Sequence, residues 1–470
     1  MRAGRVLAGA LAALCLVLSA TSAAAQTRER VDLIVGGAFV VTMEAGRQPV
    51  ADGAVAVRDG TIVAVGPRAD IVARFDAATA IDGRDRVVLP GLVNGHTHAA
   101  MTLFRGLADD RALMDWLQNW IFPAEEKFVD ADFVRAGTRL ACLEMIRGGT
   151  TTFVDMYFFN DTVAEVADEC GLRAVVAAAM IDFPSPGHKG WDDSFASGAA
   201  FVRRWQGRNG RITPAFGPHA PYTVSPEHLK QVAAAARELG APLTIHLAES
   251  PGESEDIRKR YGSTPVAWLD ANAALGRNVI AAHVVWADAP DIARLAATGT
   301  AVIHNPTSNL KLASGIAPIP EMLAAGVRVG LGTDGAASNN DLDMWEEMRL
   351  AALLHKGRTL DPTVMPAATV LRLATAGGAE AVGLGDHVGS LVPGKRADLL
   401  QVRLDAAHLT PLYDVVSHLV YAARAADVVT TVVDGKVLMR DGVVRTLDEA
   451  GVRAAAEWAA RISGGLAAGK

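Results

Sequence analysis

The stretch that decides the fold is Pro90-Gly-Leu-Val-Asn-Gly-His-Thr-His98. Residues 87–93 are almost entirely apolar and predict a buried strand, and two histidines follow at its end. Because side chains alternate across an extended chain, His96 and His98 leave the same side and can bind one cation. A His-x-His pair alone is also common in ordinary polar sequence, so the rest of the chain must supply further ligands.

Eight short apolar runs, separated by segments with helical periodicity, predict alternating strands and helices. The clearest helical segments are 131–147, 226–239, 288–297 and 343–355. Eight strands is the count of a (β/α)8 TIM-like barrel, although a doubly wound sheet shows the same alternation. The expected strands are residues 87–93, 151–155, 173–179, 211–216, 242–246, 279–283, 301–304 and 327–331.

Runs rich in β-formers occupy both ends of the chain. They are 31–35, 39–43, 54–57 and 61–65, and then 398–403, 428–433 and 436–439. Asp59-Gly60 and Asp434-Gly435 each join two runs as a tight hairpin turn would. We therefore expect an α/β protein in which residues 26–88 and 386–450 form one small β-sandwich domain. Residues 89–385 form the barrel, and residues 451–470 form a C-terminal helix and tail.

The first 25 residues have the pattern of a secretory signal peptide. Arg2 and Arg5 precede an apolar core, and small residues end the segment at Ala25. The apolar run is short for a membrane span. We expect cleavage after Ala25, export to the periplasm or beyond, and no stable membrane span in the mature protein.

The composition is that of a large globular protein without a nucleic-acid partner. The chain has 470 residues, half of them hydrophobic. Loss of Arg2 and Arg5 would change the formal net charge from −7 to −9, and no basic cluster is present. The sequence leaves open whether the protein forms a homo-oligomer. Cys142 and Cys170 are expected as a buried thiol pair, although an oxidising compartment would permit a disulfide.

Histidine and aspartate side chains stand at the ends of six of the eight predicted strands, where barrel enzymes build their sites. One such histidine would be ordinary, but six strand ends are hard to explain that way. His96, His98, His246 and Asp334 suit one divalent metal ion, with zinc the best match. No lysine ends the fourth strand to bridge a second ion. The full set is His96, His98, His219, His246, His283, His304 and Asp334.

Several motifs resemble those of the amidohydrolase superfamily. They are His96-Thr-His98, His246-Leu-Ala-Glu249, Ala282-His283, His304-Asn-Pro-Thr-Ser-Asn-Leu-Lys311 and Gly332-Thr-Asp-Gly-Ala-Ala-Ser-Asn339. From residue 31 to about 450 the chain most resembles the deaminases of 5′-methylthioadenosine and S-adenosylhomocysteine. The resemblance implies a zinc-dependent hydrolase of C–N bonds in cyclic amidines. Such an enzyme replaces the amino group of an adenosine-type nucleoside by oxygen and releases ammonia.

Deamination of an aromatic ring needs an activated water, a proton for the ring nitrogen and a proton for the departing ammonia. Glu249 lies three residues after His246, so a turn could bring its carboxyl group over the site as the acid toward ring N1. Asp334 would take the proton of the water. His283 would hold that water from the opposite side.

The resemblance also implies substrate contacts. His219 would meet the purine ring, Trp116 would form an apolar wall, and Glu125 would accept the ribose 2′ and 3′ hydroxyls. Trp116 could instead belong to the core, and Glu125 could be a solvated carboxylate at a helix end.

One position departs from the family pattern. Members that favour S-adenosylhomocysteine carry an arginine near the end of the third strand, and an ungapped alignment puts Ala178 there. The following loop, residues 183–191, also lacks an arginine, although Lys189 or an arginine of a partner subunit could take this role. We therefore expect 5′-methylthioadenosine or adenosine to be preferred over S-adenosylhomocysteine.

Two other functions fit the same residues. A guanine, oxidised-purine or triazine hydrolase could use this scaffold, and Glu125 would then have no diol to bind. A non-catalytic periplasmic nucleoside-binding protein is the other alternative. A binding protein would need no proton transfer, so the presence of Glu249, His283 and Asp334, which together could transfer protons, argues against this alternative.

Overall fold

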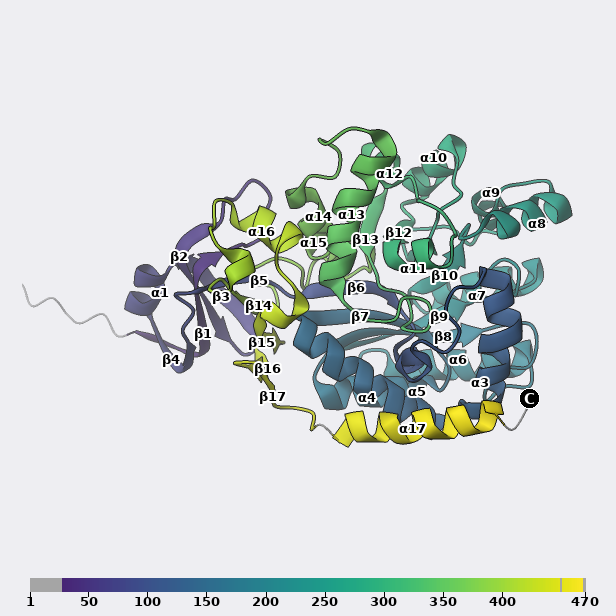
Figure 1. The fold of residues 1–470 in the computed structure, drawn as a ribbon, viewed down its shortest axis with the longest axis horizontal. Coiled ribbons are helices and arrows are strands. Elements are labelled where there is room, and N and C mark those ends of the chain that lie inside the picture. Colours follow the sequence, from purple (N-terminus) through teal and green to yellow (C-terminus); the bar gives the residue numbers. More distant parts are fainter. Residues whose placement is uncertain (1–27, 449, 468–470) are drawn as a thin grey trace, which may run out of the picture.

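The computed structural model describes residues 28–448 and 450–467. It contains two β-sheets with helices packed around them (Figure 1). Eight parallel strands form a nearly closed barrel in the order β13-β12-β11-β10-β9-β8-β7-β6, and nine strands form a second sheet. The predicted fold class is confirmed. The predicted signal peptide, residues 1–25, lies outside the described residues.

The barrel strands follow the sequence prediction closely, because each is an apolar run that is buried on both faces. Their bounds are β6 (Leu92–Thr97), β7 (Thr150–Tyr157), β8 (Arg173–Met180), β9 (Ile212–Pro218), β10 (Leu243–Leu247), β11 (Val279–His283), β12 (Ala301–His304) and β13 (Arg328–Leu331).

The first predicted strand, residues 87–93, is in fact two strands. β5 (Arg86–Pro90) belongs to the nine-stranded sheet, and β6 begins the barrel two residues later. Gly91 separates them, and a Cβ atom at this position would lie 1.9 Å from Thr151 Oγ1. The chain can therefore pass from one sheet to the other only where a side chain is missing.

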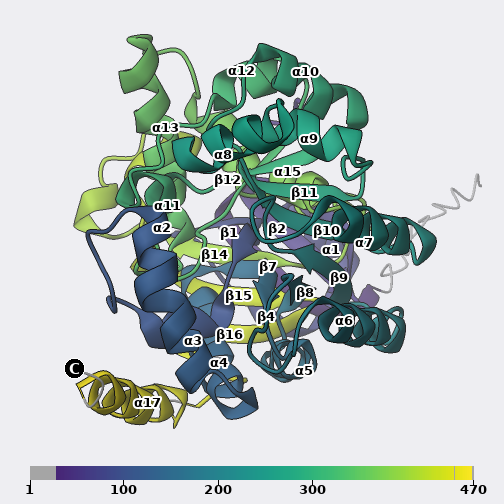
Figure 2. The ribbon, with the colours of Figure 1, turned by 90° about the vertical axis from the view of Figure 1, so that its right-hand side faces the viewer.

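Helices surround the barrel, as Figure 2 shows from one end. The four predicted helices are confirmed as α4, α7, α10 and α13, with shifts at their ends. The helices that follow the barrel strands are α4 (Ala131–Gly148), α5 (Asn160–Cys170), α6 (Trp191–Trp205), α7 (Pro226–Glu238), α8 (Pro251–Tyr261), α9 (Pro265–Ala271), α10 (Ala289–Thr298), α11 (Pro306–Lys311), α12 (Ile319–Ala324), α13 (Met344–Thr359), α14 (Ala367–Leu373) and α15 (Ala376–Ala381). Cys142 in α4 and Cys170 in α5 are buried free thiols.

A group of short helical segments follows β6 before α4 begins. It consists of the 3-10 helix η1 (Ala99–Phe104), α2 (Leu113–Trp116), the π-helical turn η2 (Leu117–Ile121) and α3 (Phe122–Phe128). A π-helical turn is rare and often lies at a functional site.

The nine-stranded sheet takes strands from both ends of the chain. β5 pairs in parallel with β1 and antiparallel with β14, so it joins the two ends. The other elements of this part are β1 (Glu29–Val40), β2 (Val50–Arg58), β3 (Thr61–Pro67), α1 (Arg68–Arg74), β4 (Phe75–Ile81), β14 (Leu399–Arg403), η3 (Ala407–Leu409), α16 (Val415–Tyr421), η4 (Ala425–Asp427), β15 (Val428–Val433), β16 (Lys436–Arg440) and β17 (Val443–Val444).

Both predicted hairpin turns are present. Asp59 and Gly60 have φ of 52° and 71°, and Asp434 and Gly435 have φ of 55° and 76°, as a type I′ turn requires. The separation of runs 31–35 and 39–43 was wrong, because β1 continues through Gly36. A Cβ atom there would lie 2.4 Å from an Arg68 guanidinium nitrogen, so this glycine makes room for an arginine and not for a turn.

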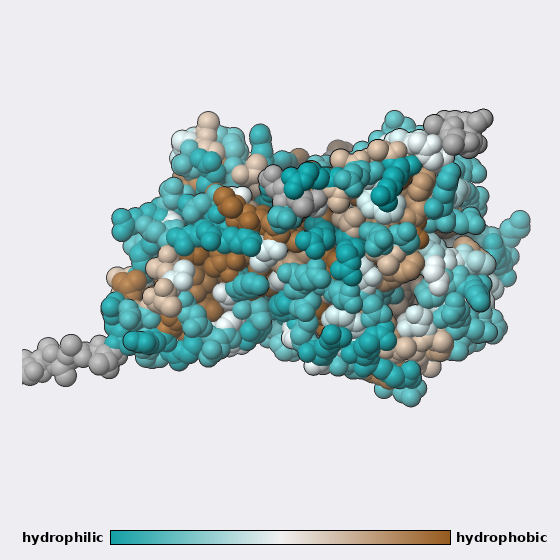
Figure 3. Space-filling view, turned by 90° about the horizontal axis from the view of Figure 1, so that it is seen from below, coloured by the Kyte–Doolittle hydropathy of each residue, from teal (hydrophilic) through white to brown (hydrophobic). Residues whose placement is uncertain are grey.

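The C-terminal helix α17 (Ala450–Ala467) lies along α4, at the bottom of Figure 1. Trp458 meets Phe133 edge-on, with 5.4 Å between ring centroids. Figure 3 views the molecule from this side, where hydrophilic residues cover much of the surface and hydrophobic residues lie between them. No helix within the described residues combines the length and apolar character needed to span a bilayer.

A buried ion pair connects the barrel to the nine-stranded sheet. Arg173, the first residue of β8, contacts both carboxylate oxygens of Asp398 at 2.8 and 3.2 Å, and both side chains are at most 3% exposed. Asp398 also accepts the backbone N–H of Asp434 at 2.7 Å. Removing one member of such a pair leaves an uncompensated buried charge.

We expect Asp398→Ala to lower the free energy of unfolding by up to about 3–5 kcal/mol, because the buried Arg173 would keep only one carboxylate contact, the longer one to Asp434 at 3.4 Å. Glu165→Ala is the matched control, since it removes an exposed pair with Arg135 at 2.7 Å. That variant should lose less than about 1 kcal/mol. Urea unfolding monitored by tryptophan fluorescence measures both, and equal losses would contradict the role given to Asp398.

Candidate functional site

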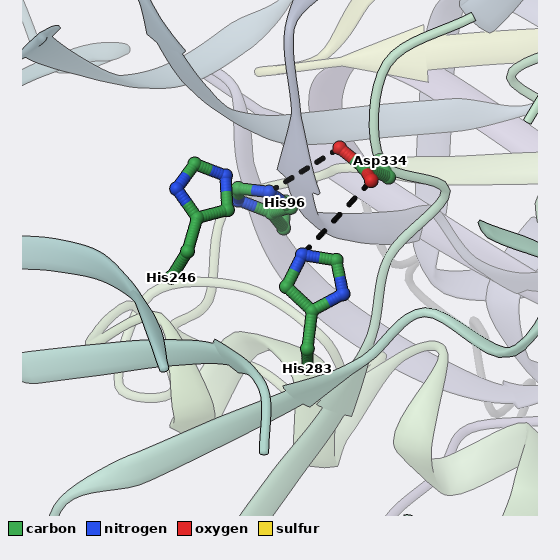
Figure 4. A group of neighbouring side chains, drawn as sticks. All are labelled: His96, His246, His283 and Asp334. Atoms are coloured by element: carbon green, nitrogen blue, oxygen red, sulfur yellow. Dashed lines mark ion pairs between the residues drawn. The ribbon is translucent and has the colours of Figure 1, made fainter. Parts of the chain in front are cut away.

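Five predicted side chains meet at the C-terminal mouth of the barrel. His96 lies in β6, His98 follows it, His246 lies in β10, His283 ends β11 and Asp334 follows β13. The ligand atoms of His96, His246, His283 and Asp334 all lie within 4.8 Å of one another (Figure 4). His98 Nε2 is 3.2 Å from both His246 Nε2 and Asp334 Oδ1.

Backbone carbonyls orient two of the imidazoles. His98 Nδ1 lies 2.6 Å from the carbonyl oxygen of Met156, and His246 Nδ1 lies 2.7 Å from that of His219. A carbonyl can only accept, so both Nδ1 atoms carry hydrogen. In neutral rings the two Nε2 atoms therefore direct lone pairs at each other across 3.2 Å. A proton on one ring, or a metal ion between them, removes this repulsion.

The spacing of the donor atoms fits a single tetrahedral ion. Ligands about 2.1 Å from zinc lie about 3.4 Å from one another. Asp334 Oδ1 is 3.5 Å from His96 Nε2 and 3.2 Å from His98 Nε2. Neither ring nitrogen of His96 has a hydrogen-bond partner among the described residues, although the ring is fully buried. The residues thus fit one divalent ion of the zinc type.

The charges at the site also suit a cation. Burial lowers the pKa of His96 to about 4, so this ring is neutral, as a metal ligand must be. Burial acts to lower the pKa of His98 as well, but Asp334 raises it to about 9. Burial alone would raise the pKa of Asp334, but His96 and His98 hold it well below its usual range. A proton and a metal ion therefore compete for the same position.

Hydrogen bonds fix Asp334 and His283 in place. Asp334 Oδ2 accepts the hydroxyls of Ser308 and Ser338 at 2.7 and 2.9 Å. His283 Nδ1 lies 2.8 Å from Asn309 Oδ1, which leaves Nε2 directed at the site. Both residues have positive φ, 65° for Asp334 and 71° for His283. Such strained positions persist only where the surrounding structure holds them.

The serines and the asparagine were missed as functional residues by the sequence reasoning. They lie inside two of the quoted motifs, 304–311 and 332–339, so their place near the site could be predicted but their partners could not.

Glu249 lies beside His283 in the cavity above this cluster. Its Oε2 is 3.8 Å from His283 Nε2, and the side chain is 5% exposed. Burial raises the pKa of Glu249, while His283 acts in the opposite direction. A carboxyl group with a raised pKa is better suited to donate a proton than an ordinary carboxylate.

The same cavity is lined by the three predicted substrate contacts. Trp116 comes from α2, Glu125 from α3, and His219 follows β9. Trp116 belongs to the core and also faces the cavity. Glu125 is not a solvated carboxylate, since it is 5% exposed and burial raises its pKa to about 7. Burial lowers the pKa of His219 to about 3, so its ring is neutral.

Ala178 does not face the cavity. Its methyl group packs toward Gly198 of α6, whereas Ala179 and Ile181 line the cavity. Ala178 therefore cannot contact a substrate in this cavity, because neighbouring strand residues face opposite sides. The expected substrate preference stays a prediction, and it is supported by the finding that no described residue lining this cavity is an arginine or lysine. Lys189 is exposed on the following loop.

Comparison with known proteins agrees with this geometry. Residues 87–438 match the Amidohydrolase family, and residues 53–78 match the imidazolonepropionase-like composite domain of bacteria. The chain belongs to the amidohydrolase family. This amidohydrolase is 49% identical over 419 residues to 5-methylthioadenosine/S-adenosylhomocysteine deaminase of Syntrophobacter fumaroxidans, with 89% of this chain and 95% of the relative covered.

Two further proteins are similar over nearly their whole length. A 5′-deoxyadenosine deaminase of Methanosarcina mazei is 48% identical to this amidohydrolase, with 92% of this chain and 99% of the relative covered. The crystal structure of an adenosine deaminase from Xanthomonas campestris with bound zinc superimposes with a TM-score of 0.91. It is 42% identical and covers 93% of this chain and 99% of its own.

We expect purified protein to retain about one divalent metal ion per chain after dialysis, because the donors form a single cluster. His246→Ala should lose most of it, since the ring supplies a donor from a separate strand. His387→Ala, which removes an exposed histidine far along the chain, is the matched control. Elemental analysis decides the point, and two tightly held ions per chain, or full occupancy in His246→Ala, would contradict the site.

Proposed function

We propose that this amidohydrolase is a zinc-dependent deaminase of adenosine-type nucleosides. The observation that carries the proposal is that one cavity holds the metal-binding cluster, the buried acid Glu249 and the buried carboxyl group of Glu125. The names of the relatives, which act on 5′-methylthioadenosine, S-adenosylhomocysteine or 5′-deoxyadenosine, support the substrate class. Export, inferred from the N-terminal segment, stays a prediction.

His96, His98, His246 and Asp334 would hold the metal. The spacings of 3.2 to 3.5 Å among them support this choice, whereas His283 Nε2 is 3.9 Å from the nearer Asp334 oxygen. When bound, zinc supplies a water nucleophile that is active at neutral pH.

Three side chains would then move or hold protons. Asp334 would accept a proton from the water that attacks C6 of the purine, while Glu249 would donate its proton to ring N1. His283 Nε2 would accept a hydrogen bond from the water and so hold it in line. As the C6–N bond breaks, Asp334 would return its proton to the departing ammonia, while the proton on N1 stays in the product. The second proton of the attacking water would leave the new C6 oxygen and restore the Glu249 acid, directly or through solvent.

The remaining contacts would orient the nucleoside. The neutral ring of His219 would hydrogen-bond the purine, and Trp116 would pack against an apolar face of the substrate. Glu125 would accept the 2′ and 3′ hydroxyls of the ribose. Its carboxyl group has a pKa of about 7 in the empty pocket, so it can be ionised at little cost when two hydroxyls donate to it.

We expect the protein to deaminate 5′-methylthioadenosine and adenosine, with S-adenosylhomocysteine about ten- to a hundredfold worse in kcat/KM. Among the described residues, no arginine or lysine lines the cavity to meet the carboxylate of the amino-acid group, and such a charge-assisted contact is worth about 1.5–3 kcal/mol. Ammonia release and the ultraviolet change from adenine to hypoxanthine measure the rates.

The same panel separates the alternatives. Guanine and a chlorotriazine belong in it, because an enzyme for a free base should be indifferent to Glu125→Gln, whereas a nucleoside deaminase should lose affinity. If S-adenosylhomocysteine were the best substrate, the cavity reading would be wrong. Arg260, which lines a neighbouring cavity that shares Phe122 and Tyr222, would then be the residue to mutate.

Glu249→Gln should keep the metal and substrate affinity but lose about a hundredfold or more in kcat, because the amide cannot donate a proton to N1 as an acid does. Asp334→Asn should reduce both metal content and kcat, since this residue has both tasks. Steady-state kinetics with metal analysis of each variant makes the comparison. Near-normal kcat in Glu249→Gln would move the acid role to His283.

A further inference from the structure

The loop that carries Glu249 has a strained backbone conformation. It consists of residues 248–250, between β10 and α8. Ala248 has φ of 49°, a left-handed conformation that costs a residue with a Cβ atom about 1–2 kcal/mol. The direction in which the Glu249 side chain enters the cavity therefore depends on contacts from outside the loop.

Glu253 supplies two such contacts. One carboxyl oxygen accepts the backbone N–H of Ala248 and the other accepts that of Glu249, both at 2.8 Å. The side chain is buried, with 4% of the residue exposed. The backbone N–H of Glu253 in turn donates to Ser250 Oγ at 3.1 Å, which begins α8.

This arrangement differs from an ordinary helix cap. In a capping box, the carboxylate at the third helical position accepts the N–H of the cap residue itself, here Ser250. Glu253 instead reaches back to the two residues before the cap. Its hydrogen bonds therefore act on the backbone that directs Glu249 and not only on the start of the helix.

The other side of the loop is held as well. The carbonyl oxygen of Ala248 accepts the N–H of Trp286 at 2.9 Å, and that of Leu247 accepts the N–H of Val284 at 3.0 Å. These bonds connect the loop to the segment that follows β11, the strand that ends at His283. Among the described residues, the Glu253 side chain thus holds the backbone N–H groups of Ala248 and Glu249, while backbone groups hold the other side of the loop.

We propose that Glu253 is a positioning residue for Glu249. Its two hydrogen bonds fix the backbone of Ala248 and Glu249, and so keep the Glu249 carboxyl group beside His283 and over the metal-binding cluster. The inference rests on the deaminase function proposed above. Glu253 itself does not touch the reacting atoms.

The first test is Glu253→Gln, which keeps the shape of the side chain. Its NH2 group cannot accept, so one of the two backbone N–H groups loses its partner. We expect kcat with 5′-methylthioadenosine to fall about ten- to a hundredfold, with KM within about twofold and metal content unchanged, because small displacements of a catalytic group have effects of this size. Glu255→Gln, an exposed glutamate on the same helix, is the matched control and should match the wild type.

The second test is a double-mutant cycle with Glu249→Gln. If Glu253 acts through Glu249, Glu253→Gln should cost no further factor in kcat once Glu249 has been replaced. The same loss in both backgrounds, or a loss confined to metal content, would overturn the inference. Glu253→Asp, which keeps two acceptors on a shorter side chain, should fall between wild type and Glu253→Gln, and gives a second measurement if the glutamine variant folds poorly.

Different results would refute the deaminase function and the positioning role of Glu253. A wild-type protein that deaminates no nucleoside would refute the proposed function. A wild-type protein that does deaminate, together with a Glu253→Gln variant of unchanged kcat, would refute the positioning role alone.

Discussion

One backbone hydrogen bond closes the ring on which the site depends. The N–H of Asp334 donates to the carbonyl oxygen of His96 at 2.9 Å and so connects the last barrel strand to the first. Gly332 makes this approach possible, because a Cβ atom there would lie 2.8 Å from the backbone nitrogen of His96. Two residues 238 positions apart are thereby held close enough for their side chains to share one ion. The barrel thus holds the metal-binding nitrogen and oxygen atoms close together, although their lone pairs repel one another.

The two ends of the barrel use buried charge differently. At the N-terminal end, Arg173 and Asp398 form a complete pair, and the gain is a fixed junction between two sheets. At the C-terminal end, Glu125 and Glu249 are buried, and no arginine or lysine lines the same cavity among the described residues. The protonation state of these two carboxyl groups therefore depends on the substrate that binds. This difference follows the general division of such barrels into a stabilising face and a functional face.

Much of the fold could be predicted because the apolar runs are long and the turns are specific. Strands such as β11 and β12, and the Asp-Gly hairpins, depend on local patterns that the sequence displays directly. The errors came from contacts between distant residues. Nothing near Gly91 indicates that Thr151 will lie against it, and nothing near Gly36 indicates that Arg68 will fill the space.

The site followed the same rule. The clustering of His96, His98, His246 and Asp334 could be predicted because metal sites need particular residue types at strand ends. The direction in which Ala178 points required the register of β8. The role of Glu253 was also hidden, although Ser250-Pro-Gly-Glu253 has the spacing of a capping box, because the sequence does not tell which N–H groups the carboxyl oxygens reach.

The central position of β5 has a consequence for how the chain is made. β5 lies between β1 and β14, and Leu89 pairs with Leu400 across more than three hundred residues. During synthesis the ribosome produces every barrel strand before it produces β14, so one edge of β5 stays unpaired until almost the whole chain has emerged. An unpaired edge is a place where another strand can add. In a nascent chain, the region most exposed to misassembly is therefore the nine-stranded sheet and not the barrel that carries the metal-binding cluster.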